Sequence, residues 1–280
     1  KADWKQTQEY AREWIEFQGG KLDPFERVLS KWQPKKPLPI QLNDARSARN
    51  NDTLLVGLSD LHFGGKASKE VLFSGKDFNS ETIRGILQIY AQKIADHVNE
   101  LKTKYGRVAV VSLGDILHTL TGFTVKGTPL STDVIGEAQF ELAMDCLVEF
   151  MNQMLRLFPK VDVYAVKGNH AGVGDYILYR AIQAHFRTDP RIQFHLSKSR
   201  QACFRIGNVA VLMDHGASDV SKSMIPTSGA SKEAYIQALF LAYPDILNGT
   251  KCRLMLQGDR HRFMCEELRG FEHVILRSEE

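Results

Sequence analysis

The chain has 280 residues, enough for one large domain with a sizeable core or for two smaller domains. Apolar residues make up 43% and charged residues 25% of the sequence, which is typical of soluble globular proteins. The net charge of +3 is too small to indicate a nucleic-acid partner by itself. No apolar stretch approaches the ~20 residues that cross a bilayer and no signal peptide is visible, so we expect no membrane partner.

Four cysteines form no CxxC pair, and their spacing fits no zinc ribbon. Three of them sit in apolar runs, which favours small buried hydrophobic side chains over a chemical role. We therefore expect a reduced, intracellular protein with a cytoplasmic location. Because the chain begins with Lys1 rather than Met, a fragment of a longer protein is also compatible with the sequence.

Residues 1–50 differ in character from the rest of the chain. Apolar and aromatic residues at helical spacing predict a helix over 1–18. Residues 33–52 hold three prolines and scattered basic residues, which is typical of a linker, so we place a domain boundary near residue 50. The aromatic residues of this N-terminal helical segment are interpreted as a packing surface. A basic arm that binds nucleic acid, a homodimer contact and a docking arm for a partner are the alternatives.

Residues 51–280 form the predicted main domain. Three short valine-rich runs predict buried strands at 53–59, 107–113 and 161–167. Apolar residues at helical spacing predict two intervening helices, over about 83–101 and 134–157. Alternating strands and helices indicate an α/β layered fold.

After residue 200 the pattern changes to closely spaced strands. The stretch 202–213 predicts two strands joined at Gly207-Asn208, which is a hairpin signal. Two further strands are predicted at 252–257 and 273–278.

Side chains that can bind metal follow most of these strands. They are Asp60, His62, Asp115, His118, Asn169, His170, His215, Asp259 and His261. Because α/β sheets build their sites in the loops after the carboxyl ends of strands, we expect these side chains to converge. Each motif taken alone occurs by chance or in an ordinary turn, whereas their joint order favours a functional site. Carboxylate, imidazole and amide oxygen together suit divalent Mn, Fe or Zn. Two such metals ~3.5–4 Å apart can activate a water and clamp a phosphoryl group.

The whole series of motifs resembles the calcineurin-like metallophosphoesterase superfamily over roughly residues 53–278. The matching motifs are Asp60-x-His62, Gly114-Asp115, Gly168-Asn169-His170, His215 and Gly-x-x-His261. The resemblance implies a mixed α/β (α+β) fold, a two-sheet β-sandwich flanked by helices, with two divalent metal ions at one edge.

The resemblance also implies a role for each matching residue. The first metal would be held by Asp60, His62, Asp115 and His261, and Asp115 would bridge to the second metal. The second metal would be held by Asn169, His215 and the residue at position 259. His170 would act as the general acid or steady the leaving oxygen, and a water between the metals would attack phosphorus.

Three positions depart from the family pattern. Asp259 stands where the family has the first histidine of a GHxH motif, which makes the site harder and favours Mn²⁺ or Mg²⁺ over Zn²⁺; a decayed site or an engineered change is the alternative. Ala171 stands where an acid usually orients the preceding histidine, so another group must orient His170 or leave it a weaker acid. His118 can contact substrate phosphate or lie behind the ligands. The Arg-Gly pair of protein Ser/Thr phosphatases is absent after it, which counts against that activity.

Two long polar insertions, 119–133 and 216–232, border the predicted site and contain three lysines. They can line a groove for a phosphate backbone or be solvated caps. Arg260 can likewise reach substrate phosphate or solvent. The arrangement is similar to bacterial and phage DNA-repair exonucleases of the superfamily, so we expect a phosphodiesterase acting on DNA or RNA. A nucleotide or cyclic-nucleotide phosphodiesterase, a phosphomonoesterase and a catalytically weakened scaffold are the alternatives.

Overall fold

The computed structural model describes residues 52–70, 77–101, 104–123, 128–216, 229–260, 263–268 and 270–276. The predicted N-terminal helix, and the predicted linker up to residue 51, lie outside these residues. Within the described part of the chain, no helix is long and apolar enough to span a membrane.

The first sheet has four parallel strands in the order β1-β2-β3-β4. Its strands are β1 (Thr53–Leu58), β2 (Arg107–Ser112), β3 (Val161–Ala165) and β4 (Ile192–Leu196). The crossovers contain α3 (Ser80–Glu100), α4 (Gly136–Leu157) and α5 (Val173–His185). Helix α3 begins where the Asn79 side chain accepts a hydrogen bond from the backbone N–H of Thr82. The three predicted strands and two predicted helices are confirmed, whereas β4 and α5 were not predicted.

The second sheet has five strands in the order β5-β6-β7-β9-β8. They are β5 (Gln201–Ile206), β6 (Val209–Asp214), β7 (Cys252–Gln257), β8 (Met264–Leu268) and β9 (Phe271–Ile275). The hairpin is confirmed, and Gly207 in its turn has a φ of +58°. Strands β6, β7 and β9 run parallel to one another, so the carboxyl ends of β6 and β7 share an edge.

The prediction for the last strand was wrong in its bounds. Strand β9 begins at Phe271, two residues before the predicted start, because it pairs with β8 across a turn at Gly270, with Leu268 opposite Phe271. The edge strand β8 and the helices α6 (Gly229–Ala242) and α7 (Pro244–Leu247) were not predicted.

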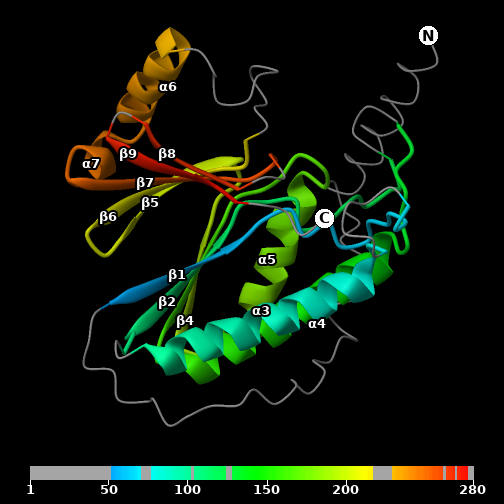
Figure 1. Ribbon diagram of the computed structural model, residues 1–280. Helices are drawn as coiled ribbons and strands as arrows, with labels where there is room; N and C mark the ends of the chain where they lie inside the picture. Colours follow the sequence, from blue (N-terminus) through cyan, green and yellow to red (C-terminus); the bar gives the residue numbers. More distant parts are fainter. Residues whose placement is uncertain are drawn as a thin grey trace, which may run out of the picture.

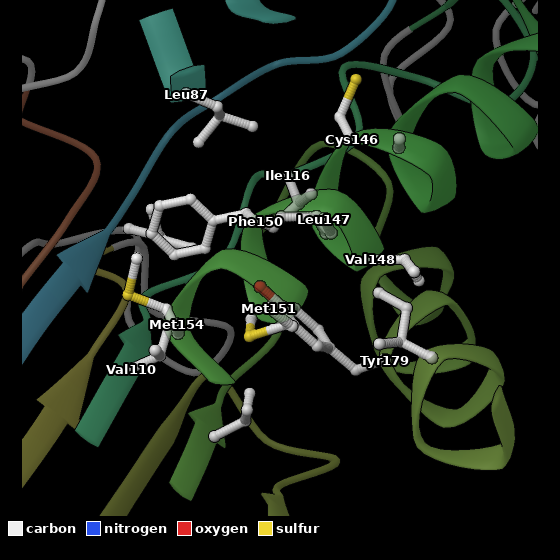
Figure 2. Packing of buried hydrophobic residues seen from close by; sticks show 14 of the residues in the cluster. Leu87, Val110, Ile116, Cys146, Leu147, Val148, Phe150, Met151, Met154 and Tyr179 are labelled. Carbon is white, nitrogen blue, oxygen red and sulfur yellow. The ribbon is translucent and has the colours of Figure 1, made fainter. Parts of the chain in front are cut away.

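The elements stack in four layers: α3, α4 and α5, then the first sheet, the second sheet, and finally α6 and α7 (Figure 1). Each junction between layers holds a cluster of buried apolar side chains. Alternate residues of β2 serve two clusters, since Val110 packs toward the helices and Val111 toward the second sheet. Figure 2 shows Phe150 and Met151 of α4 among the residues of the helix-side cluster. The expected two-sheet α/β architecture with flanking helices is therefore present.

The cysteines are free thiols, but only two are the buried hydrophobic residues that the sequence predicts. Cys146 and Cys203 are buried, whereas Cys252 and Cys265 are exposed. Cys252 is the first residue of β7, and Cys265 lies on the edge strand β8, which has a neighbour on one side only. Position in the sheet therefore overrides the apolar sequence context.

Candidate metal centre

The carboxyl ends of strands from both sheets meet at one edge of the sandwich. His215 directly follows β6 of the second sheet. Its Nδ1 donates, at 2.7 Å, to the carbonyl oxygen of Leu113, which directly follows β2 of the first sheet. In the loop that follows β7, the backbone N–H of Asp259 donates to both carboxylate oxygens of Asp60, at 3.1 and 3.2 Å. The two sheets are thus joined through the side chains that the sequence singles out.

Backbone strain is concentrated at the same place. Among the described residues, four non-glycine residues have a positive φ: Asp60 (52°), His62 (49°), Asp115 (50°) and Asp259 (63°). This left-handed conformation is unfavourable for residues with a side chain, and it persists where surrounding structure enforces it, often at functional sites. All four are among the predicted metal ligands.

Two glycines allow the loops that carry these side chains to approach closely. A Cβ at Gly168 would overlap with the Asp115 carboxylate and with the backbone nitrogen of Asp115. Gly114 has a φ of +91°, and a Cβ there would meet the backbone of Gly168. The glycines in the Gly-Asp and Gly-Asn-His motifs are therefore required by the close approach of two loops.

A buried group of two carboxylates and one imidazole forms the floor of the site. The potential ligand atoms of Asp60, Asp115 and His215 all lie within 4.8 Å of one another. Burial lowers the pKa of His215, but the facing carboxylates, Asp115 foremost, outweigh it and raise that pKa to about 9. Burial raises the pKa of Asp60, and it acts in the same direction on Asp115. At Asp115 the imidazoles around it prevail, with His215 the largest, and hold the pKa well below its usual range.

Asn169 and Asp259 stand around the same imidazole. Nε2 of His215 lies 2.6 Å from Oδ1 of Asn169, 3.3 Å from Oδ2 of Asp115 and 3.8 Å from Oδ1 of Asp259. The side chain of Asp259 is 21% exposed, whereas His215 is fully buried. Position 259 thus presents a carboxylate oxygen toward the residues predicted to hold the second metal.

Three histidines form a second group beside the first. His62, His118 and His170 each offer a ring nitrogen within 4.8 Å of the others. His62 is buried, while His118 and His170 are partly exposed. Nε2 of His170 lies 3.9 Å from Oδ2 of Asp115, and the backbone N–H of His170 donates to Oδ1 of Asp115 at 2.8 Å. The rings of His118 and His170 form the rim between the buried carboxylates and solvent.

Asp175, in the first turn of α5, supports the site and was missed by the sequence analysis. Its fully buried carboxyl group accepts three backbone N–H groups: those of Asp115 (3.0 Å), Leu117 (3.1 Å) and Gly168 (2.9 Å). Burial, and then the nearby Asp115 carboxylate, raise the pKa of Asp175 to about 7. The available signal was an acidic residue five positions after His170, just inside a helix that was not predicted.

Several predicted residues lie outside the described part of the chain. His261 is one of them, so its predicted role as a ligand stays a prediction. The same holds for segments 124–127 and 217–228, which contain two of the three insertion lysines; the side chain of the third, Lys232, is not described either. Arg260 is half-buried, and its backbone N–H donates to the carbonyl oxygen of Gly258 at 2.8 Å. Its predicted contact with substrate stays a prediction.

The donor set fits divalent metal ions. The buried group offers two carboxylates and one imidazole, and the amide oxygen of Asn169 and the carboxylate of Asp259 lie next to it. Oxygen-rich ligand sets with one or two imidazoles suit Mn²⁺ and related ions, whereas the cluster of three histidines offers nitrogen only. The strained backbone at Asp60, Asp115 and Asp259 accompanies the convergence of these side chains at one place.

Comparison with known proteins gave structural likenesses only. No model of a protein family matches this chain, and no curated protein matches it. A single-mutant Vps29 from Entamoeba histolytica is similar at 15% identity, covering 81% of this chain and 73% of that one, with a TM-score of 0.32. Phosphopantetheinyl hydrolase from Mycobacterium tuberculosis is similar at 10% identity, covering 81% and 90%, with a TM-score of 0.33. Sulfate thiohydrolase SoxB from Thermus thermophilus is similar at 11% identity, covering 83% and 53%, with a TM-score of 0.35.

Proposed function

We propose that this chain is a metal-dependent phosphoesterase of the calcineurin-like type, and that it hydrolyses phosphodiesters of DNA or RNA. The observation that carries the proposal is the convergence of Asp60, Asp115 and His215, from three strands of two sheets, within 4.8 Å. Backbone strain at Asp60 and Asp115 supports it, because such strain serves function rather than stability.

Asp60, His62, Asp115, Asn169 and His215 would hold two divalent metal ions, Mn²⁺ foremost, with Asp259 as a further oxygen ligand. When bound, such ions stabilise negative charge on phosphoryl oxygens and lower the pKa of a water molecule. Asp115 would be shared by the two ions, because its ligand oxygen lies within 4.8 Å of ligand atoms of both Asp60, assigned to the first ion, and His215, assigned to the second.

His170 is the proposed proton donor. Hydrolysis adds water across a P–O bond, and the departing oxygen must gain a proton as that bond breaks. His170 is 28% exposed, so a substrate arriving from solvent can reach it, while its Nε2 lies 3.9 Å from the Asp115 carboxylate. Nε2 would then release a proton from the doubly protonated ring, while Nδ1 keeps the hydrogen that it donates to the carbonyl oxygen of His118.

The preference for a diester of nucleic acid rests on the sequence. The two insertions that follow site loops are rich in Ser and Thr and contain three lysines, which are side chains that can contact a phosphate backbone.

The test is hydrolysis of bis-p-nitrophenyl phosphate beside p-nitrophenyl phosphate by metal-stripped protein titrated with Mn²⁺. Two variants enter the site, Asp115→Asn and His170→Ala, and Asp96→Ala on the exposed face of α3 is the matched control. We expect Mn-dependent diester hydrolysis that both site variants reduce at least ~100-fold and the control leaves unchanged. Hydrolysis of single-stranded and duplex DNA and RNA is then measured with the same variants.

Two outcomes would contradict the proposal. A preference for the monoester would remove the nuclease assignment and leave a phosphomonoesterase. Protein that binds fewer than two Mn²⁺ ions and turns over neither ester nor nucleic acid would favour a scaffold that has kept the fold and lost the chemistry.

A further inference from the structure

His118 lies beside the metal ligands without belonging to the buried carboxylate group. The loops after β1 and β2 continue side by side beyond the sheet, where the backbone N–H of His62 donates to the carbonyl of Asp115 at 2.9 Å. One step further, the backbone N–H of His118 donates to the carbonyl of Phe63 at 2.9 Å. This backbone ladder fixes where the His118 side chain starts.

The ring of His118 contacts the ring of His62 through like nitrogens. Nδ1 of His118 lies 3.3 Å from Nδ1 of His62, and the rings meet edge-on at 79° with centroids 5.2 Å apart. Gly65 lies close to the same ring, because a Cβ there would come within 3.2 Å of Cγ of His118. The two rings are thus close enough for one hydrogen bond between their Nδ1 atoms, and its direction depends on which ring carries the proton there.

Only one of the two facing nitrogens can carry the proton when both rings are neutral. If Nδ1 of His62 is the donor, its Nε2 keeps a lone pair and can bind metal. If the proton sits on Nδ1 of His118 instead, Nε2 of His62 carries a hydrogen and cannot be a ligand. The position of one proton therefore decides whether His62 is competent as a ligand.

The backbone of His118 contacts the third histidine. The carbonyl oxygen of His118 lies 3.1 Å from Nδ1 of His170. Because a carbonyl can only accept, Nδ1 of His170 must be the donor, and Nε2 is the nitrogen left to face Asp115. This contact provides the orienting group that Ala171, at the position after His170, does not supply.

We propose that His118 is a positioning residue that sets the proton positions on two other histidines, on His62 through its ring and on His170 through its backbone carbonyl. The inference rests on the proposed function in one respect, because the proton position on His62 matters only if His62 binds metal through Nε2. The proton positions on these rings are measurable in metal-stripped protein without turnover. His118 accordingly acts through other residues.

The test is nitrogen NMR of ¹⁵N-histidine-labelled, metal-free protein at a pH where these rings are neutral. Wild-type protein should show His62 and His170 protonated on Nδ1 and His118 protonated on Nε2. In His118→Ala, His62 should lose its fixed tautomer, whereas His170 should keep its own, because the backbone carbonyl remains. A collapsed loop would disturb both rings, so His170 serves as the internal control for folding.

Metal titration provides the second readout. His118→Ala should weaken Mn²⁺ binding ~10–100-fold, as removal of a partner behind a metal-bound histidine does. His118→Gln can present an acceptor oxygen to His62 and should recover part of that loss. The control is His185→Ala at the end of α5, which should change neither metal binding nor tautomers.

The outcomes separate this inference from the proposed function. His62 protonated on Nε2 in wild-type protein, or unchanged tautomers and Mn²⁺ affinity in His118→Ala, would overturn the role of His118. The expected tautomers in a protein that hydrolyses no phosphoester would refute the proposed function and leave the role of His118 intact.

Discussion

Replacing Asp175 with alanine should destabilise the metal-free protein strongly, although the residue is not a predicted ligand. The substitution removes the acceptor of three backbone N–H groups, those of Asp115, Leu117 and Gly168. A buried donor left without a partner costs ~1–3 kcal/mol. Three donors without a partner or a water molecule would therefore lower the free energy of unfolding by at most ~9 kcal/mol.

Two effects reduce that limit. The space left by the carboxyl group is lined by three donors and can admit a water molecule. The variant also no longer carries the desolvation cost of the buried carboxyl, which is what raises the pKa of Asp175 to about 7. We therefore expect Asp175→Ala to lower the free energy of unfolding by ~2–4 kcal/mol.

Asp175→Asn should have an intermediate effect. One oxygen, Oδ2, accepts from both Asp115 and Gly168, and an asparagine carbonyl can keep these two bonds. The amide group would then face the N–H of Leu117, donor against donor, for a loss of ~1–2 kcal/mol.

The assay is urea unfolding in EDTA, followed by circular dichroism and extrapolated linearly to water. Asp96→Ala on the surface of α3 is the control and should change the unfolding free energy by less than ~0.5 kcal/mol. A loss below ~1 kcal/mol for Asp175→Ala would refute the view that this carboxyl group holds the two site loops together.

Three further predictions concern the same loops and the helix beside them. Gly168→Ala should lower the free energy of unfolding by about 2 kcal/mol or more and abolish Mn²⁺ binding, because the added Cβ overlaps with Asp115. Urea unfolding measures the stability and calorimetric titration measures the Mn²⁺ affinity. Wild-type Mn²⁺ affinity in this variant would contradict the close approach of the two loops. Gly85→Ala, in the interior of α3 with open space around it, should instead raise stability by ~0.5–1 kcal/mol in the same unfolding assay. The pKa of His215 in metal-free protein is about 9, so its charge stabilises the fold fully below the unfolded value of ~6.5 and that contribution is lost as pH rises through 9. Because a metal must displace this proton, Mn²⁺ affinity should rise roughly tenfold per pH unit between ~6.5 and ~8.5 in calorimetric titrations, with release of one proton, and a flat profile would show that His215 does not bind metal.

The sequence by itself determined the elements whose signals are local. Runs such as Val108–Val111 are apolar on both faces, because β2 lies between the helices and the second sheet. Gly207-Asn208 encodes a hairpin turn by its backbone preferences. The ligand-type side chains were found because polar residues at the ends of apolar strands conflict with the pattern around them.

Other elements have no clear local signal. Helix α6 places apolar residues such as the 83%-exposed Leu241 around its circumference, so its sequence lacks the one-sided stripe of a surface helix. Strand β8, with the sequence MCEEL, is stabilised by pairing with β9 on one side only and carries charged residues typical of an edge.

Only the tertiary structure decided how the site is assembled. Asp175 reaches Asp115 across 60 residues, and His118 reaches His62 across 56, so no spacing rule in the chain relates them. The parallel strands bring the loops to one edge, and the packing of the second sheet on the first brings His215 to the carbonyl of Leu113, 102 residues away. Local preferences specify a strand and the polar loop after it, but which groups share a proton or a metal depends on distances that exist only after both sheets have packed.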